Sequence, residues 1–134
     1  MSDIEKYDAL HVAACEIIHS SQMQDHTIAF RMLNTAYNLL MGGIVAGHRA
    51  SIDGLAVFYS GINDFEPTPE QIATISSLLS GHASRGDAHA TFAMMHVVSY
   101  ASGHKDGVSW AQRAAAMGHE AAIDHMRWLS LMII

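Results

Sequence analysis

The chain has 134 residues, half of them hydrophobic and 15% charged, which suits a globular domain and excludes a disordered chain. Its 13 acidic and 7 basic residues give a formal charge of −6, so we expect no nucleic-acid binding, which needs a basic surface. The single cysteine excludes a fold held by internal disulfide bonds, and no apolar run is long enough to span a membrane. Because the N-terminus is also unlike a signal peptide, we expect a cytoplasmic protein with no membrane attachment.

Capping signals and apolar spacing predict two helices at the start of the chain. The first begins after Ser2, with Glu5 completing a capping box. The second begins near Asp25, and Gly42 and Gly43 are expected to weaken its end. Its apolar residues recur every three or four positions, as an amphipathic helix requires; they are Ala29, Met32, Leu33, Ala36, Tyr37 and Leu40.

The middle of the chain predicts a third helix over about residues 49–60 and a loop at residues 63–67. A fourth helix follows, because Thr68 suits an N-cap, Pro69 suits the first helical position and Gln71 can complete a capping box.

The last third of the chain predicts three more helices, over about residues 88–102, 108–117 and 120–131. No alternating run of apolar residues is bounded by a hairpin turn, so we expect no strand. The sequence therefore predicts an all-α protein of about seven helices.

The pair Gly-His occurs four times, and its first and last copies open matching segments. Residues 47–53 (Gly-His-Arg-Ala-Ser-Ile-Asp) align with residues 118–124 (Gly-His-Glu-Ala-Ala-Ile-Asp), with five identical positions of seven and an offset of 71 residues. A third opening, Gly86-Asp87-Ala88, lies between them. Helix-pair repeats have periods of about 34–40 residues, so the offset is about two periods and predicts stacked helix hairpins, as in a short tetratricopeptide-like solenoid.

This periodicity predicts a single helical-repeat domain over residues 1–134. We expect N-terminal capping helices in residues 1–46, helix hairpins in residues 47–85 and 86–117, and a C-terminal capping helix in residues 118–134. Hairpins of this kind bury their apolar faces by stacking on neighbours, and the stack leaves an open groove.

A set of family motifs lies between Gly86 and Met126. The first helix of this segment opens with Gly-Asp-Ala-x-Ala and an aromatic residue, and the second contains a tryptophan, Ala-Ala and Gly-His; the residues are Gly86-Asp87-Ala88-His89-Ala90, Phe92, Trp110, Ala114-Ala115, Gly118-His119 and Ala121. In these motifs the segment resembles the Sel-one-like repeat, a branch of the tetratricopeptide-like helical repeats. The resemblance implies a glycine-rich loop at residues 103–107 and a scaffold or adaptor that binds another protein without chemistry of its own.

The chain has ten histidines, and two of them share a face of the predicted 88–102 helix. His89 and His96 are seven residues apart, almost two turns, and Tyr100 lies one turn further. Two histidines at this spacing stand ~10 Å apart along a helix axis, so they cannot hold one metal ion unless other helices contribute ligands. We predict that His89, His96 and Tyr100 contact a partner protein, and we expect no metal, cofactor or catalytic residue.

Three other patterns resemble chemical motifs and are interpreted as structural. The segment after His119 lacks the second histidine of a zinc-protease helix. Glu16 and His19 have the spacing of a di-iron ligand pair, but no second pair exists. Cys15 has a histidine four residues away on each side, and we interpret it as a small buried side chain.

The chain ends in an apolar run, residues 128–134, which is seldom left in water. We expect this run to pack into the core of the chain, with a homodimer contact as the alternative. The sequence as a whole predicts a non-enzymatic protein-binding module, an adaptor or an inhibitor, with a partner that has a basic surface. Two alternatives stay open: a histidine-rich helical bundle that binds a metal or cofactor, and a homo-oligomeric structural protein held together by the apolar C-terminus.

Overall fold

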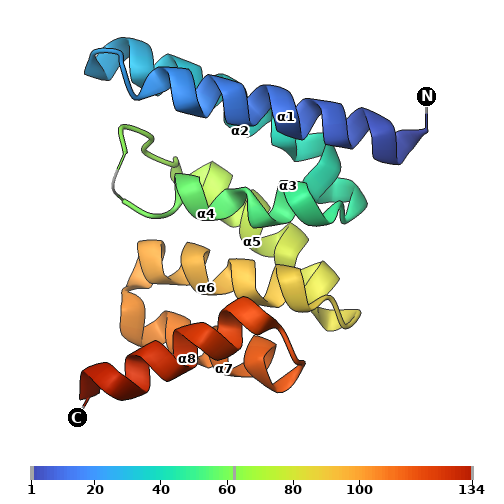
Figure 1. Ribbon diagram of the computed structural model, residues 1–134, viewed down its shortest axis with the longest axis vertical. Coiled ribbons are helices and arrows are strands. Elements are labelled where there is room, and N and C mark those ends of the chain that lie inside the picture. Colours follow the sequence, from blue (N-terminus) through green and yellow to red (C-terminus); the bar gives the residue numbers. More distant parts are fainter. Residues whose placement is uncertain (1, 62, 134) are drawn as a thin grey trace. The chain divides into compact units, whose positions relative to one another are not determined.

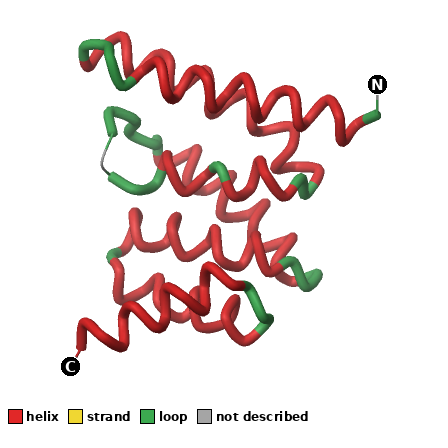
Figure 2. Tube along the Cα trace, in the orientation of Figure 1, coloured by secondary structure: helices red, strands yellow, loops and turns green. Residues whose placement is uncertain are grey.

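The computed structural model describes residues 2–61 and 63–133, and every regular element in these residues is a helix (Figures 1 and 2). The prediction of an all-α fold is therefore confirmed. The chain divides into two compact units, Met1–Gln71 and Ile72–Ile134, called here the first and second units. None of the helices in the described residues combines the length and apolarity that a membrane span requires.

The first unit is built around a hairpin of two long helices, with two short helices after it. Its helices are α1 (Asp3–Ser21), α2 (His26–Ala46), α3 (Arg49–Asp53) and α4 (Leu55–Phe58). α1 packs along α2, and α3 contacts both. The predicted capping box is present, because the Ser2 hydroxyl accepts from the Glu5 backbone and the Glu5 carboxylate accepts from the Ser2 backbone. Asp25 caps α2 as expected, by accepting from the backbone N–H of Ile28.

The second unit contains α6 (Ala88–Ser102), α7 (His104–Ala116) and α8 (Glu120–Ile133). α6 and α7 make the most extensive helix contact among the described residues, and α8 packs on α7. The predicted pairing of the 88–102 helix with the next helix is thus confirmed. α5 (Pro69–Ser84) begins in the first unit and continues into the second. Its predicted capping box is present, with Thr68 and Gln71 bonded reciprocally at 2.8 and 3.1 Å.

Glycines account for the places where the helix boundaries differ from those predicted. α2 continues through Gly42 and Gly43. Position 43 is a glycine because α3 packs closely against it, and a Cβ there would overlap the Ser51 side chain. The helix predicted over residues 49–60 is divided at Gly54 into α3 and α4.

The loop implied at residues 103–107 is wrong. Gly103 alone, with φ of 101°, separates α6 from α7. Gly107 lies inside α7, where a Cβ would overlap the Ser99 hydroxyl and lie 2.9 Å from the carbonyl oxygen of Met95. The glycine therefore allows α7 to approach α6 closely. It belongs to a contact between two helices and not to a loop.

The two units have cores of different composition. In the first, Tyr37 is buried against Phe58, Tyr59 and Phe65, with ring centroids 5.0–6.4 Å away. The Tyr37 and Tyr59 hydroxyls share a hydrogen bond of 2.9 Å, and burial raises the pKa of Tyr37. In the second unit, α5 buries Ile75 and Leu79, and the buried apolar residues of the other helices are smaller or unbranched; they are Ala90, Ala93, Met94, Met95, Val97, Ala111, Ala114 and Ala122.

Three helix junctions share one geometry, at residues 47–48, 86–87 and 118–119. Each begins with a glycine in the left-handed region, with φ of 79°, 90° and 88°. The next residue donates its backbone N–H to the carbonyl five residues earlier, as in a Schellman motif, over 2.7, 3.2 and 3.1 Å. The side chain of that residue, a histidine, an aspartate and a histidine in turn, then accepts from the backbone N–H three residues ahead.

Candidate functional site

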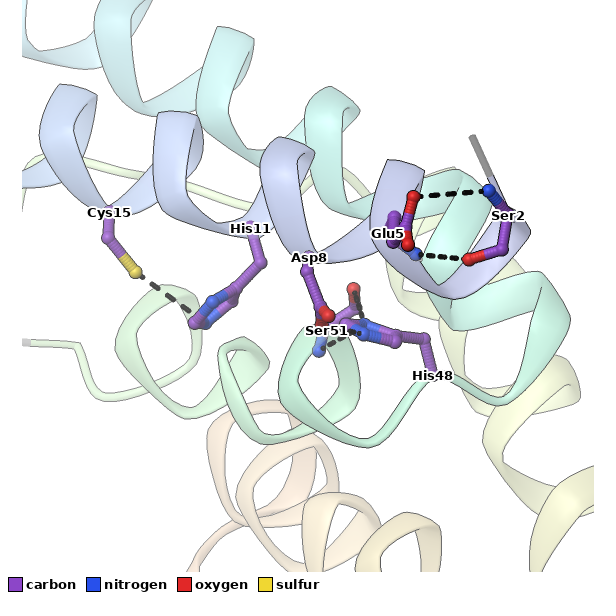
Figure 3. Close-up of polar contacts among 7 residues, drawn as sticks. All are labelled: Ser2, Glu5, Asp8, His11, Cys15, His48 and Ser51. Carbon is purple, nitrogen blue, oxygen red and sulfur yellow. Dashed lines mark hydrogen bonds and ion pairs between the residues drawn. The ribbon is translucent and has the colours of Figure 1, made fainter.

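The first unit contains a chain of hydrogen bonds between a carboxylate, a histidine and a serine (Figure 3). Asp8 Oδ1 lies 2.7 Å from His48 Nε2, and His48 Nδ1 lies 2.8 Å from Ser51 Oγ. The order matches that of a serine hydrolase, but Ser51 is only 1% exposed and its hydroxyl cannot meet a substrate.

The same histidine has a structural role that explains the arrangement. His48 Nδ1 accepts from the Ser51 backbone N–H at 3.3 Å, which caps α3. Because Nδ1 is an acceptor, the neutral ring carries its proton on Nε2 and donates it to Asp8 of α1. The chain of hydrogen bonds therefore ties α1 to the start of α3.

Cys15 is exposed, so its interpretation as a buried side chain is wrong. Its Sγ lies 3.5 Å from Nε2 of His11, one turn earlier on α1 (Figure 3). The neighbouring Ala14 is fully buried instead. One residue along a helix turns the side chain by ~100°, which is enough to move it from the core to the surface.

The second unit gathers half of the ten histidines of the chain around two aromatic rings. We call this group the histidine cluster; it comprises His89 and His96 of α6, His104 of α7, His119 before α8, and His125 of α8. Phe92 lies at its centre, with ring centroids 4.9–6.1 Å from those of three of the histidines. His125 lies 5.8 Å from His104 and 6.4 Å from Trp128, centroid to centroid.

A histidine pair joins α6 to the start of α8. His119 Nε2 and His89 Nδ1 are 3.1 Å apart, and His119 Nδ1 accepts from the Ala122 backbone N–H at 3.2 Å. With Nδ1 occupied as an acceptor, a neutral His119 has its proton on Nε2 and donates it to His89. A metal ion held between the two rings would have to displace this proton and would take the cap away from α8. The geometry is that of a hydrogen-bonded pair.

Two histidines of the cluster, His96 and His125, favour the neutral form. Burial lowers the pKa of His96 below its ordinary value of 6.5, and the nearby His125 lowers it further. Burial also lowers the pKa of His125, with a smaller contribution from His104. Nε2 of His125 is buried and has no hydrogen-bond partner among the described residues. A proton added to His125 would therefore be poorly solvated and would face other histidines.

The residues predicted for partner contact all lie on α6 but differ in accessibility. His89 and His96 are partly buried within the histidine cluster, whereas Tyr100, near the end of the helix, is 37% exposed. Their role in binding stays a prediction. Sequence reasoning missed His104, His119 and His125 as neighbours of α6; the recurring Gly-His pair was the one signal that marked two of them.

Three large apolar side chains near the end of α8 are exposed. Trp128, Leu131 and Met132 are 54%, 74% and 66% exposed, and their spacing places them on one side of the helix. We call these three residues the α8 face. The expectation that the run 128–134 packs into the core is wrong for these three residues, whereas Leu129 is partly buried and residue 134 lies outside the described residues.

No protein-family model, no curated protein and no solved structure matches the chain. The resemblance to the Sel-one-like repeat therefore stays a prediction.

Proposed function

We propose that this chain is a non-enzymatic protein-binding module, an adaptor or an inhibitor, whose partner docks on the α8 face. The observation that carries the proposal is the exposure of Trp128, Leu131 and Met132. Large apolar side chains grouped on one exposed helix face mark interaction sites more often than free surface. Tryptophan is also among the residues that contribute most to binding energy at protein interfaces.

The chemistry of the surface suggests the kind of partner. The formal charge of −6 favours a partner with a basic surface, because opposite charge speeds association and suppresses wrong partners. The α8 face would supply the apolar centre of the interface. Tyr100, exposed near the end of α6, is a further candidate for contact.

The helix junctions support a repeat of the Sel-one-like or tetratricopeptide-like type. Three junctions, 71 residues apart from first to last, share the left-handed glycine and the side-chain cap. Repeats of this type commonly present a helix face to another protein. The cytoplasmic location predicted from the sequence belongs to the same proposal.

Partner capture with a matched pair of surface variants tests the proposed function. Leu131→Asp places a charge on the α8 face, and Val12→Asp places one on α1, where Val12 is 55% exposed. The wild type and the two variants would be used to capture proteins from the native host, and the captured protein would then be purified and titrated. We expect Leu131→Asp to weaken binding at least about tenfold and Val12→Asp to leave it unchanged.

Two results would overturn the proposal. The first is equal binding of the purified partner by the wild type and Leu131→Asp. The second is a wild-type dimer, measured by solution mass over rising concentration, that Leu131→Asp converts to monomer; this result would favour the homo-oligomeric alternative.

A further inference from the structure

The α8 face rests on the histidine cluster. Trp128 lies next to His125, with 6.4 Å between ring centroids, and His125 in turn lies next to His104 at the start of α7 and Phe92 of α6. His125 therefore stands where three helices meet, one turn before the first residue of the α8 face.

The surroundings of His125 in the second unit contain little to balance a positive charge. α6 has no aspartate, glutamate, lysine or arginine. The charged residues of α7 and α8 are all exposed, and Asp124 is paired with Arg127 at 3.7 Å; these residues are Lys105, Asp106, Arg113, Glu120, Asp124 and Arg127. The pKa values of His125 and His96 are lowered mainly by burial and, to a smaller extent, by a neighbouring histidine.

We infer that protonation of His125 and His96 releases α8 from α6 and α7, so that the α8 face is presented at neutral pH and lost in mild acid. Two positive charges close together at a three-helix contact repel each other, and α8, which contributes His125 and packs on α7, is the element displaced. The conformational step does not depend on the proposed function. Only its consequence, that partner binding follows pH, rests on that function.

The conformational step can be measured without a partner. The protein has two tryptophans, so Trp110→Phe leaves Trp128, on α8, as the only one. Trp128 emission and amide hydrogen exchange in α8 would be followed from about pH 8 to about pH 5. We expect a transition with a midpoint below 6.5, in which exchange in α8 rises roughly tenfold or more after correction for the intrinsic pH dependence.

Matched glutamine variants assign the transition to the cluster. His125→Gln with His96→Gln removes both titrating rings and should abolish the change, whereas His19→Gln, on the exposed side of α1, should retain it. Ring proton chemical shifts of the wild type, titrated by NMR, provide a second measurement if the double variant is poorly folded. They should show His96 and His125 titrating together with the change in α8.

The inference is overturned if Trp128 emission and α8 exchange stay constant over this pH range, or if the double variant keeps the wild-type transition. These outcomes are separate from those of the capture experiment. A pH transition without binding at the α8 face would contradict the proposed function alone, and binding that is independent of pH would contradict this inference alone.

Discussion

The two units place their histidines in opposite electrostatic settings. In the first, His26 lies 2.8 Å from Asp64 and His48 lies 2.7 Å from Asp8, so each ring has a carboxylate partner. In the second, the contacts of His96 and His125 are with other histidines and aromatic rings. A carboxylate therefore raises the pKa of His26 in the first unit, whereas burial lowers the pKa of His96 and of His125 in the second.

The cores differ in a parallel way. The first unit depends on large rings around Tyr37, whereas α6, α7 and α8 approach closely through alanine and glycine. Removal of a large buried ring is destabilising because it leaves a cavity. Addition of side-chain atoms at a close helix contact is destabilising because the added atoms collide with the facing helix. Substitutions in opposite directions should therefore damage the two units.

The largest expected effect is the loss of an aromatic ring from the first unit. Phe58 is fully buried against Tyr37 and Phe65. Phe58→Ala should lower the free energy of unfolding by about 3–5 kcal/mol, measured by denaturant titration. Phe58→Leu is the control and should cost clearly less. Equal costs for the two substitutions would contradict a core that depends on ring packing.

The next effect tests close packing in the second unit. Gly107→Ala should destabilise by about 1–3 kcal/mol, because its Cβ would meet Ser99 and the Met95 carbonyl. Gly81→Ala is a matched change inside α5, where the nearest atoms, in the Arg85 side chain, are 3.8 Å away. This control should be neutral or stabilise by up to about 1 kcal/mol. Thermal unfolding of both variants decides the matter, and a stable Gly107→Ala protein would show that α7 approaches α6 less closely.

A smaller effect on stability is expected at the histidine caps, of which each unit has one. His48→Ala and His119→Ala should each cost about 1 kcal/mol, because each leaves a backbone N–H of the next helix without its acceptor. His48→Asn keeps a capping oxygen but is too short to reach Asp8. Comparison of His48→Asn with His48→Ala in denaturant titrations therefore separates the cap from the link to α1. If His48→Asn is as unstable as His48→Ala, the link to Asp8 is the dominant contribution.

The free energy of unfolding should depend on pH with opposite sign in the two units. The pKa values of His96 and His125 are lowered, so between these values and 6.5 the unfolded chain binds more protons and stability falls as pH falls. The Asp64 carboxylate raises the pKa of His26, so this pair adds stability below 6.5 that is lost as pH rises through the raised value. Because the His26 side chain is 68% exposed, its contribution should be the smallest.

Amide exchange resolved by residue can follow the two units separately as pH is lowered. We expect protection to fall in the second unit while the residues around His26 keep theirs. His26→Gln should change only the protection of the residues around position 26 and leave the loss of protection in the second unit unaltered. A uniform loss of protection along the whole chain would show that the two settings are not independent.

The helix starts could be predicted because their signals are local. Ser2 with Glu5, Asp25, and Thr68 with Gln71 each bond within one turn, so the sequence contains both partners of every cap. Helix ends at glycine were harder to predict. The glycines at 43 and 107 occur where helices approach closely, and a glycine in such a contact has the same local sequence signal as one in a loop.

The site could be predicted only in part, for a related reason. His89 and His96 share one helix face, and their spacing made them visible. Their neighbours His119 and His125 are about thirty residues further along the chain, and only tertiary packing brings them to α6. The outward turn of Trp128 likewise depends on which side of α8 meets α7, which no local pattern specifies.

The buried hydroxyl pair of Tyr37 and Tyr59 makes the first unit respond to alkali. Since burial raises the pKa of Tyr37, its phenol cannot ionise until the surrounding rings separate. In a Tyr100→Phe variant, which lacks the tyrosine of the second unit, ultraviolet absorbance in strong base should thus register opening of the first unit, whereas both tryptophans lie in the second. The chain consequently contains separate optical reporters for its two halves, and simultaneous recording of both would reveal whether they unfold together or in sequence.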